Sequence, residues 1–193
     1  RIMSYYYLSH RTIRHLVRRA DAIPQASLLD ALAWMSRAAE YDELPVRHNE
    51  DLINAELAKA LPFPPSAVGG LPMWDPHVKA FLLMQAHFSR VELPITDYVG
   101  DLTSVLDQSI RVIQASIDVM AELGRLTSAL RFVTLLQCVK QGVWPDDPAV
   151  AVLPGVEEPV PETAKKLTIK ELASLPREDH PSLAKILSIS PHQ

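Results

Sequence analysis

GDLTSVLDQSIRVIQASIDVMAELG, residues 100–124, is the stretch that decides the fold. It contains no proline, and its apolar residues recur at intervals of three and four, as they do along one face of an α-helix. Gly124 closes the stretch, and glycine is the residue that most often follows a helix end. We therefore predict a long helix over about residues 100–123, whose apolar face carries Leu102, Leu106, Ile110, Ile113, Ile117 and Met120.

Helical patterns also flank this stretch, separated by prolines rather than by glycine-rich turns. The chain holds 16 prolines and 6 glycines, a balance that favours helices joined by short, stiff connections. Ser27 is placed to cap one helix and Asp75-Pro76 to start another, because aspartate accepts from free backbone N–H groups and proline needs no donor there. The apolar spacing predicts helices over about residues 9–20, 27–41, 49–61, 76–93 and 127–144.

The two ends of the chain carry different patterns. Residues 1–8 are rich in tyrosine and are expected to be extended or irregular. Residues 145–165 hold five prolines and are expected to form a linker or irregular segment. Thr168 and Glu171 match a capping box that opens a short helix, and a second short helix is expected at about residues 181–189.

Together these patterns predict an all-α chain, built as a helical bundle followed by a small helix-loop-helix domain. The bundle spans residues 9–153, and the linker and helix-loop-helix domain span residues 154–193. With 193 residues, 48% of them apolar, the chain is long enough to bury a core of its own. It begins with Arg1 rather than methionine, so we expect it to lie inside a longer polypeptide.

Charge and cysteine content exclude several classes of protein. The net charge of −4 argues against wholesale coating of nucleic acid. Residues 1–19 nevertheless carry five arginines and no acid, so this end either meets phosphate or an acidic neighbour, or is a solvated helix face. Cys138 is the only cysteine, which rules out a disulfide framework and favours a reducing compartment, nuclear or cytoplasmic. No apolar run reaches the roughly 20 residues that span a bilayer, so no membrane partner is expected.

Motifs for catalysis, nucleotide binding and metal binding are missing from the sequence. It contains no G-x-x-x-x-G-K-[ST], no G-x-G-x-x-G and no G-x-S-x-G. His77 and His87 share a predicted helix but lie ten residues apart, on different faces, and Cys138 has no companion at a zinc-binding spacing. We therefore expect no catalytic residue, no metal and no cofactor in this chain.

A cluster of charged residues interrupts the helical patterns at RAAEYDELPVRHNED, residues 37–51. A catalytic pair of carboxylates is one interpretation of it. We favour another, in which Arg47 and His48 donate hydrogen bonds to nearby acids or helix-end carbonyls and lock the loop, because nothing nearby supplies a nucleophile or cofactor. Gln85 and His87, which lie in a largely apolar helix, are expected to be satisfied in the same way by neighbouring helices.

Polar residues line one side of the long helix. The stripe consists of Ser104, Gln108, Arg111, Ala115 and Asp118, and Asp107 and Gln114 flank it. Arginine binds phosphate or stacks on a base, and serine and glutamine bond to sugar or phosphate, so the stripe is a candidate contact for a nucleic-acid strand. The alternative is an ordinary solvated face with an ion pair between Asp107 and Arg111.

Four segments of the chain resemble a known family. They are SYYYLSHRTI (4–13), AAEYDELPVRHNEDLINAELAKAL (38–61), DPHVKAFLLMQAHFSR (75–90) and VLDQSIRVIQASIDV (105–119), in this order. Together they resemble the Brl region, or Sec63 homology unit, of the large Ski-like helicases with two cassettes. LPVRHNED and ELAKALP look most like the second cassette of the type found in the activating signal cointegrator complex, with the spliceosomal type as runner-up. The resemblance is strong over residues 1–153 and weak beyond them.

This resemblance implies a place for each part of the chain. Residues 1–8 would be the exit from a winged-helix domain, and residues 9–153 the bundle that packs beside two motor domains. In such helicases one bundle helix, the ratchet, lies along the translocating single strand, and residues 101–123 correspond to it. The strand contacts expected on it are Arg111, Ser104, Gln108 and Gln114. ATP and magnesium are expected in the parent helicase, whose motor residues lie outside this chain.

The resemblance leaves more than one function open. The first is a non-catalytic accessory module that guides single-stranded RNA or DNA during ATP-dependent 3′-to-5′ unwinding. The second is an interaction scaffold that docks other subunits of a multiprotein complex. A third is the Brl region of the endoplasmic-reticulum translocation factor, a protein–protein module, but the SYYY start and the LPVRHNED motif argue against it.

Overall fold

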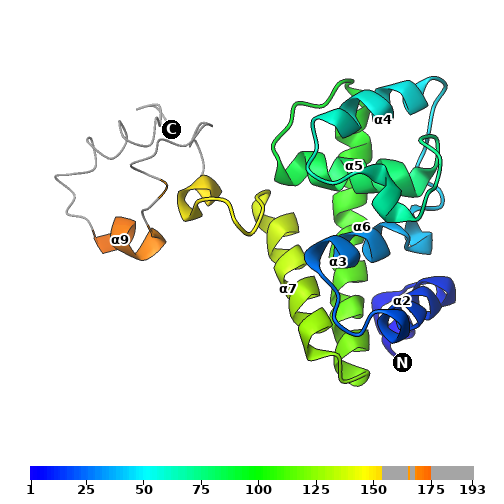
Figure 1. Cartoon of the computed structure of the whole chain (residues 1–193), viewed down its shortest axis with the longest axis vertical. Coiled ribbons are helices and arrows are strands. Elements are labelled where there is room, and N and C mark those ends of the chain that lie inside the picture. Colours follow the sequence, from blue (N-terminus) through cyan, green and yellow to red (C-terminus); the bar gives the residue numbers. More distant parts are fainter. Residues whose placement is uncertain (154–164, 166–167, 175–193) are drawn as a thin grey trace. The chain divides into compact units, whose positions relative to one another are not determined.

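Helices make up the regular structure of this chain, as the computed structural model in Figure 1 shows. The structure describes residues 1–153, 165 and 168–174, and within them it contains α-helices and short 3-10 helices but no strand. The predicted all-α class is therefore confirmed. The chain divides into two compact units, residues 1–142 and residues 143–193.

The first unit contains seven α-helices. They are α1 (Ile2–Tyr6), α2 (His10–Ala22), α3 (Leu28–Ser36), α4 (Glu50–Lys59), α5 (Pro76–Phe88), α6 (Asp97–Glu122) and α7 (Leu126–Gln141). Two short 3-10 helices, η1 (Ala39–Tyr41) and η2 (Pro65–Val68), shape the loops that follow α3 and α4.

Local capping explains where several of these helices begin and end. Ser27 and Asp30 form a capping box, in which the Asp30 backbone N–H donates to Ser27 Oγ over 3.1 Å. Asp75 accepts a hydrogen bond of 2.8 Å from the first turn of α5, with Pro76 at the first helical position. Gly124 follows α6 with a φ of +68°. The predicted starts at Ser27 and Asp75 and the predicted stop at Gly124 are confirmed.

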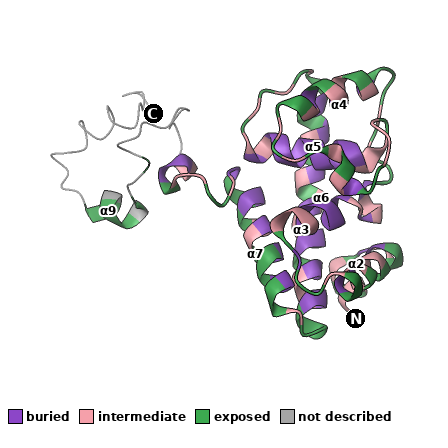
Figure 2. Ribbon diagram, viewed as in Figure 1, coloured by how far each residue is buried: buried purple, intermediate pink, exposed green. Residues whose placement is uncertain are grey.

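The long helix α6 is the centre of the first unit. After the turn at Gly124, α7 runs back alongside it (Figure 1), and α1, α2, α3 and α5 also contact it. Figure 2 shows that most of α5 is buried, together with the facing sides of α6 and α7. This shared apolar burial is the main stabilising term of the unit. Neither α6 nor any other helix in the described residues has the length and apolar character needed to cross a membrane.

The buried side of α6 differs from the predicted one. Of the six residues expected to face the core, Ile113 and Met120 are buried and the other four are half-buried. The buried stripe lies about a quarter turn away and runs through Val105, Ser109, Val112, Ser116 and Val119. The prediction failed because it counted only large apolar residues. A buried serine satisfies its hydroxyl within its own helix, as Ser116 Oγ does with Val112 O at 2.7 Å, and so permits close packing.

Residues 1–8 were expected to be extended or irregular, and this is wrong, because they contain the short helix α1. The helix ends at Tyr6, since Tyr7 adopts the left-handed backbone conformation with a φ of +53°. The Tyr6 hydroxyl donates a hydrogen bond of 2.8 Å to Asp118 on α6. A helix of one turn is too short to be stable alone, so contact with α6 is what holds it.

The second unit is described at residues 143–153, 165 and 168–174. It contains η3 (Ala149–Val152) and α9 (Ile169–Ser174). Glu171 accepts from the Thr168 backbone N–H over 2.8 Å, and Thr168 Oγ1 accepts from the Glu171 N–H over 3.2 Å. The predicted capping box is therefore confirmed. The second short helix predicted at 181–189, and most of the predicted linker, lie outside the described residues.

Candidate nucleic-acid interface

Lys79 is the centre of a buried group of charges that joins α4, α5 and α6. Its side chain is fully withdrawn from solvent, and its ammonium lies 2.5 Å from Glu50 Oε2 and 2.7 Å from Asp101 Oδ2. It also donates to the carbonyl of Pro45 over 2.7 Å and lies 4.5 Å from the centre of the Tyr98 ring. An ammonium group has three N–H donors, so these three acceptors satisfy it.

Arg47 closes this group on its solvent side. Its Nη1 donates to Glu50 over 2.9 Å and to Asp101 over 2.7 Å, and its Nε lies 3.2 Å from Asp97. The Arg47 side chain is 41% exposed, whereas those of Glu50 and Asp101 are 2% and 8% exposed. Arg47 thus supplies a second positive charge to two buried carboxylates. We call Arg47, Glu50, Lys79 and Asp101 the buried ion network.

The two cations keep both carboxyl groups ionised. Burial alone raises the pKa of Glu50 and of Asp101, but hydrogen bonds from Lys79 and Arg47 outweigh it, and the pKa of each carboxyl lies below its ordinary value. The network therefore fastens α4, α5 and α6 together, with Lys79 and Arg47 both donating to Glu50 and Asp101.

The sequence identified Arg47 but missed Lys79 and Asp101. One signal was present, since Lys79 is the only charged residue in HVKAFLLM, and a charge inside a buried helix requires a partner. The identity of that partner depends on how α5 packs against α6, which local patterns do not specify.

The other three residues expected in polar contacts lie in different environments. Gln85 accepts from the Phe63 backbone N–H over 2.9 Å and donates to its carbonyl over 3.2 Å. His87 Nε2 lies 3.0 Å from the carbonyl of Val139. His48 does not join Arg47: in the part of the chain that the structure describes it is exposed and has no hydrogen bond, because the turn before α4 leaves it in solvent.

The predicted strand contacts lie along one side of α6 and differ in exposure. Ser104 and Gln114 are exposed, while Gln108 and Arg111 are half-buried. Arg111 Nε donates to Gln108 Oε1 over 2.9 Å, and its Nη2 donates to the same oxygen. Arg111 Nη1 donates to the carbonyl of Tyr7 over 3.1 Å. The guanidinium is thus held by both α6 and the end of α1.

Helix α1 covers part of this polar side. Ala115 is buried, and Asp118 accepts the Tyr6 hydroxyl. Burial and this hydrogen bond raise the pKa of Tyr6 to about 12. The alternative of an ion pair between Asp107 and Arg111 is wrong, because among the described residues Arg111 bonds to other acceptors. The stripe is therefore open at its N-terminal part and partly covered beyond Arg111.

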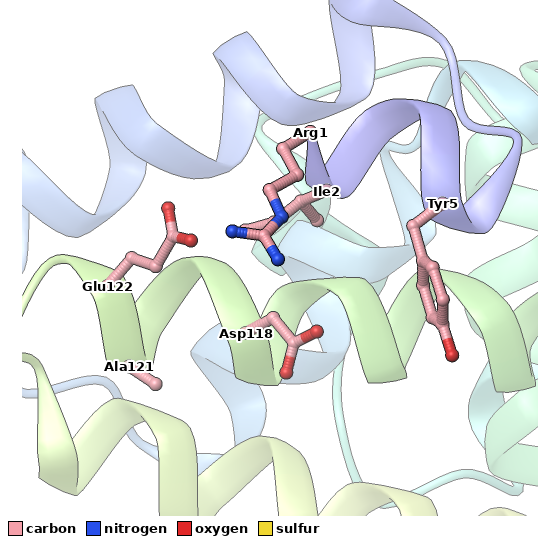
Figure 3. A pocket seen from close by; sticks show the side chains of 6 residues that line it. All are labelled: Arg1, Ile2, Tyr5, Asp118, Ala121 and Glu122. Atoms are coloured by element: carbon pink, nitrogen blue, oxygen red, sulfur yellow. The ribbon is translucent and has the colours of Figure 1, made fainter.

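A pocket lies where α1 meets the end of α6 (Figure 3). It has a volume of about 440 Å³, and Arg1, Ile2, Tyr5, Asp118, Ala121 and Glu122 line it. In Figure 3 the guanidinium of Arg1 lies between the carboxylates of Asp118 and Glu122. Tyr5 is 75% exposed at this pocket, and Tyr7, just after α1, is 85% exposed. Sequence reasoning noted the tyrosines but assigned them no role, because their exposure depends on the unexpected helix α1.

Comparison with protein families decides what kind of chain this is. A family model described as the Sec63 Brl domain matches residues 1–190. The chain belongs to the Sec63 Brl domain family. The resemblance inferred from four sequence segments is thereby confirmed.

Two of the three curated relatives described here for this Sec63 Brl chain are named as helicases. It is 49% identical over 160 residues to the RQC trigger complex helicase SLH1 of Saccharomyces cerevisiae and 46% identical over 157 residues to activating signal cointegrator 1 complex subunit 3 of Homo sapiens. It is 45% identical over 181 residues to the DExH-box ATP-dependent RNA helicase DExH14 of Arabidopsis thaliana. These matches cover 81%, 81% and 92% of the chain but only 8%, 7% and 8% of the relatives. The chain therefore spans less than a tenth of their length.

Proposed function

We propose that this chain is the accessory bundle of an ATP-dependent helicase and that it guides a single nucleic-acid strand along the polar side of α6. The observation that supports the proposal most directly is the hydrogen bonding of the Arg111 guanidinium. Three of its five N–H donors bond to Gln108 and to the Tyr7 carbonyl, and among the described residues the other two have no acceptor. A guanidinium that is already fixed in place loses little freedom when it binds a phosphate.

Neighbouring side chains extend this contact in both directions. Ser104 and Gln114 are exposed on the same helix and are able to bond to sugar or phosphate oxygens. Tyr7, whose carbonyl accepts from Arg111, and Tyr5 on α1 both carry exposed rings, and every base has a face that stacks on an aromatic ring. This combination binds a strand without reading a particular sequence, as a guiding surface requires.

The names of the relatives support the helicase setting, since two of those described are named as helicases. In this proposal the motor domains lie elsewhere in the same polypeptide, bind ATP and magnesium there, and move the strand in the 3′-to-5′ direction. Single-stranded RNA or DNA is the substrate. Other subunits of a multiprotein complex are further partners, and the location is nuclear or cytoplasmic.

The test is Arg111→Glu in the full polypeptide that carries this chain. The reversed charge repels the strand, so we expect unwinding of a duplex with a 3′ overhang to slow by about tenfold, with unchanged binding of ATP. Arg131→Glu, a charge reversal at an exposed position of α7, is the matched control. Unwinding by Arg111→Glu at the rate of the control would refute the assignment of α6 as the strand contact.

A second candidate function is a scaffold for other subunits, and α7 favours it. Leu126, Leu130 and Val133 are 71%, 55% and 36% exposed and recur at helical spacing on one side. An exposed apolar strip of this kind marks an interaction surface. Salt separates the two functions, because phosphate contacts weaken steeply as salt rises, whereas apolar docking does not.

A further inference from the structure

A basic pocket lies between α2, the end of α3 and the start of α5. It has a volume of about 310 Å³, and its polar lining consists of Arg11, Arg14, His15, Arg18, Arg37 and His77. Four arginines thus surround one concave site. The chain as a whole carries a net charge of −4, so the concentration of positive charge here is a local feature.

Three of the arginines form a row on α2. Arg11, Arg14 and Arg18 are three and four residues apart, which places them on one face of the helix over about 10 Å of its length. Like charges at this spacing repel one another and weaken a helix slightly. The mutual repulsion of the row is therefore unfavourable for α2, and an anionic ligand would offset it.

Acidic side chains balance the positive charge of the pocket at one edge only. Asp42 lies 2.6 Å from Arg11 and 3.2 Å from His77, and among the described residues it is the carboxylate that pairs with the lining. Arg14 lies 3.3 Å from His10 Nδ1. Within the same residues Arg18 forms no ion pair, and neither does Arg14. Two guanidinium groups therefore remain available to an anion.

Arg37 is held in place at the inner side of the pocket. Its Nη1 donates to the carbonyl of Val68 over 2.8 Å. The next residue, Gly69, has a φ of +86°, and a Cβ at that position would lie 2.5 Å from Arg37 Nη1. Glycine is therefore required for the guanidinium to sit this close to the backbone. A guanidinium that is positioned in advance is well suited to binding a planar or tetrahedral anion.

His15 adds an unmet polar atom to the same pocket. Its Nε2 is buried and has no hydrogen-bond partner among the described residues. Burial, followed by the positive charges of Arg19 and Arg37 and by His77, lowers the pKa of His15 to about 4. The ring is therefore neutral at physiological pH. An anion in the pocket would offset the positive charges that act on it.

We propose that this pocket binds a backbone phosphate of the single strand, at a second contact separate from the polar side of α6. The choice of a nucleic-acid strand as the ligand rests on the proposed function. The choice of the site rests on the row of arginines on α2, on the fixed position of Arg37 and on the small number of acids near the pocket. The lining holds no phenylalanine, tyrosine or tryptophan, and its four arginines outnumber its two histidines, so the phosphate rather than the base is the group that it recognises. The contact is therefore independent of sequence.

The test measures strand binding by the 193-residue chain with Arg14→Gln and Arg18→Gln combined. Fluorescence anisotropy of labelled oligouridylate and oligothymidylate is followed as salt is raised. We expect binding to weaken about tenfold, and the slope of log affinity against log salt to become shallower by about 0.7, which is the contribution of one phosphate contact to a single strand. Thermal melting confirms that the variant is folded.

The matched control removes two charges elsewhere. Arg131→Gln with Lys140→Gln takes the same charge from exposed positions of α7 and is expected to leave the salt slope near that of the unmodified chain. Arg14→Lys with Arg18→Lys keeps the charge and is expected to restore the slope. An equal loss in the α7 control and the α2 variant would overturn the pocket, since only net charge would then matter.

Two further outcomes separate this proposal from the proposed function. If Arg111→Gln leaves strand binding unchanged while Arg14→Gln with Arg18→Gln weakens it, the proposed strand contact on α6 is refuted and the phosphate site in the basic pocket is supported. If the strands do not bind but labelled oligoglutamate binds with the same dependence on Arg14 and Arg18, the site belongs to an acidic peptide and the phosphate proposal is overturned.

Discussion

The ammonium of Lys79 lies 2.5 Å from Glu50 Oε2, and the two side chains are 0% and 2% exposed. Charges withdrawn from water to this extent are stable only when they are paired and hydrogen-bonded. The pair joins α5 to the first turn of α4, and Asp101 extends it to α6. Removal of either partner leaves the other buried charge with less compensation, so the bundle is expected to be sensitive to substitution at this contact.

Lys79→Met is therefore expected to lower the free energy of unfolding by about 3–5 kcal/mol. Methionine fills a similar volume but leaves Glu50 and Asp101 with Arg47 as their remaining cation. Urea denaturation measures the loss. Lys59→Met is the control, since Lys59 forms an ion pair of 2.6 Å with Glu56 in which the side chains are 69% and 72% exposed. That change should cost less than about 1 kcal/mol, and a similarly small cost for Lys79→Met would contradict the importance of the network.

The buried ion network also predicts how stability depends on pH. The pKa values of Glu50 and Asp101 lie below their ordinary values of 4.5 and 3.8, so the unfolded chain binds protons more readily than the folded one in acid. The stability that these carboxylates contribute is complete above their ordinary values and is lost as the pH falls through the lowered, folded values. We expect the urea midpoint to fall between neutral pH and about pH 3.

Glu50→Gln tests the origin of this dependence. The variant removes one of the two titrating carboxylates, so its urea midpoint should be lower at neutral pH and should fall less steeply in acid. An acid dependence as steep as that of the unmodified chain would show that other carboxyl groups are responsible.

Short-range features of this fold were predictable and long-range ones were not. Ser27, Asp75 and Gly124 mark helix ends through bonds and backbone angles within a few residues, and their roles were predicted correctly. Lys79 illustrates the opposite case, because its partners lie 29 and 22 residues away and meet it only in the packed bundle.

Predictions for the candidate site on α6 were likewise limited to features that depend on nearby residues. Sequence periodicity placed the core side of α6 about a quarter turn from its observed position, because Ser109 and Ser116 bury hydroxyls that bond to their own helix. It also left residues 1–8 without a helix, since α1 depends on contact with Asp118 and Arg111. The four residues predicted as strand contacts do lie on α6, but the contact of α1 with this side of the helix was not foreseen.

Two glycines after helices offer a matched pair of stability tests. Gly124 and Gly142 have φ values of +68° and +63°, where an alanine costs roughly 1–2 kcal/mol. A Cβ at Gly124 would meet no atom within 4 Å, whereas a Cβ at Gly142 would lie 3.2 Å from the His87 ring. His87 bonds to the carbonyl of Val139 over 3.0 Å, so a shift of its ring to make room for the Cβ would strain that bond.

Gly142→Ala is therefore expected to cost about 1 kcal/mol more than Gly124→Ala. Chemical denaturation of the two variants measures the difference directly, since both share the backbone cost. Equal losses would mean that the His87 ring gives way freely and that its bond to Val139 contributes little.

Substitution of Tyr7 is expected to change strand binding without lowering the stability of the fold. It is 85% exposed and has a φ of +53°, so the chain bears the backbone cost of a tyrosine there while burying little of its ring. Tyr7→Gly removes the ring and relieves the backbone, and we expect the free energy of unfolding to stay unchanged or to rise by up to about 1 kcal/mol. Strand binding should weaken by about 1–3 kcal/mol, because a stacked base loses its platform. Tyr7→Phe keeps the platform and should bind as the unmodified chain does. If Tyr7→Gly bound the strand as tightly as Tyr7→Phe, the exposed ring would have no part in guiding it, and α6 alone would have to carry the contact.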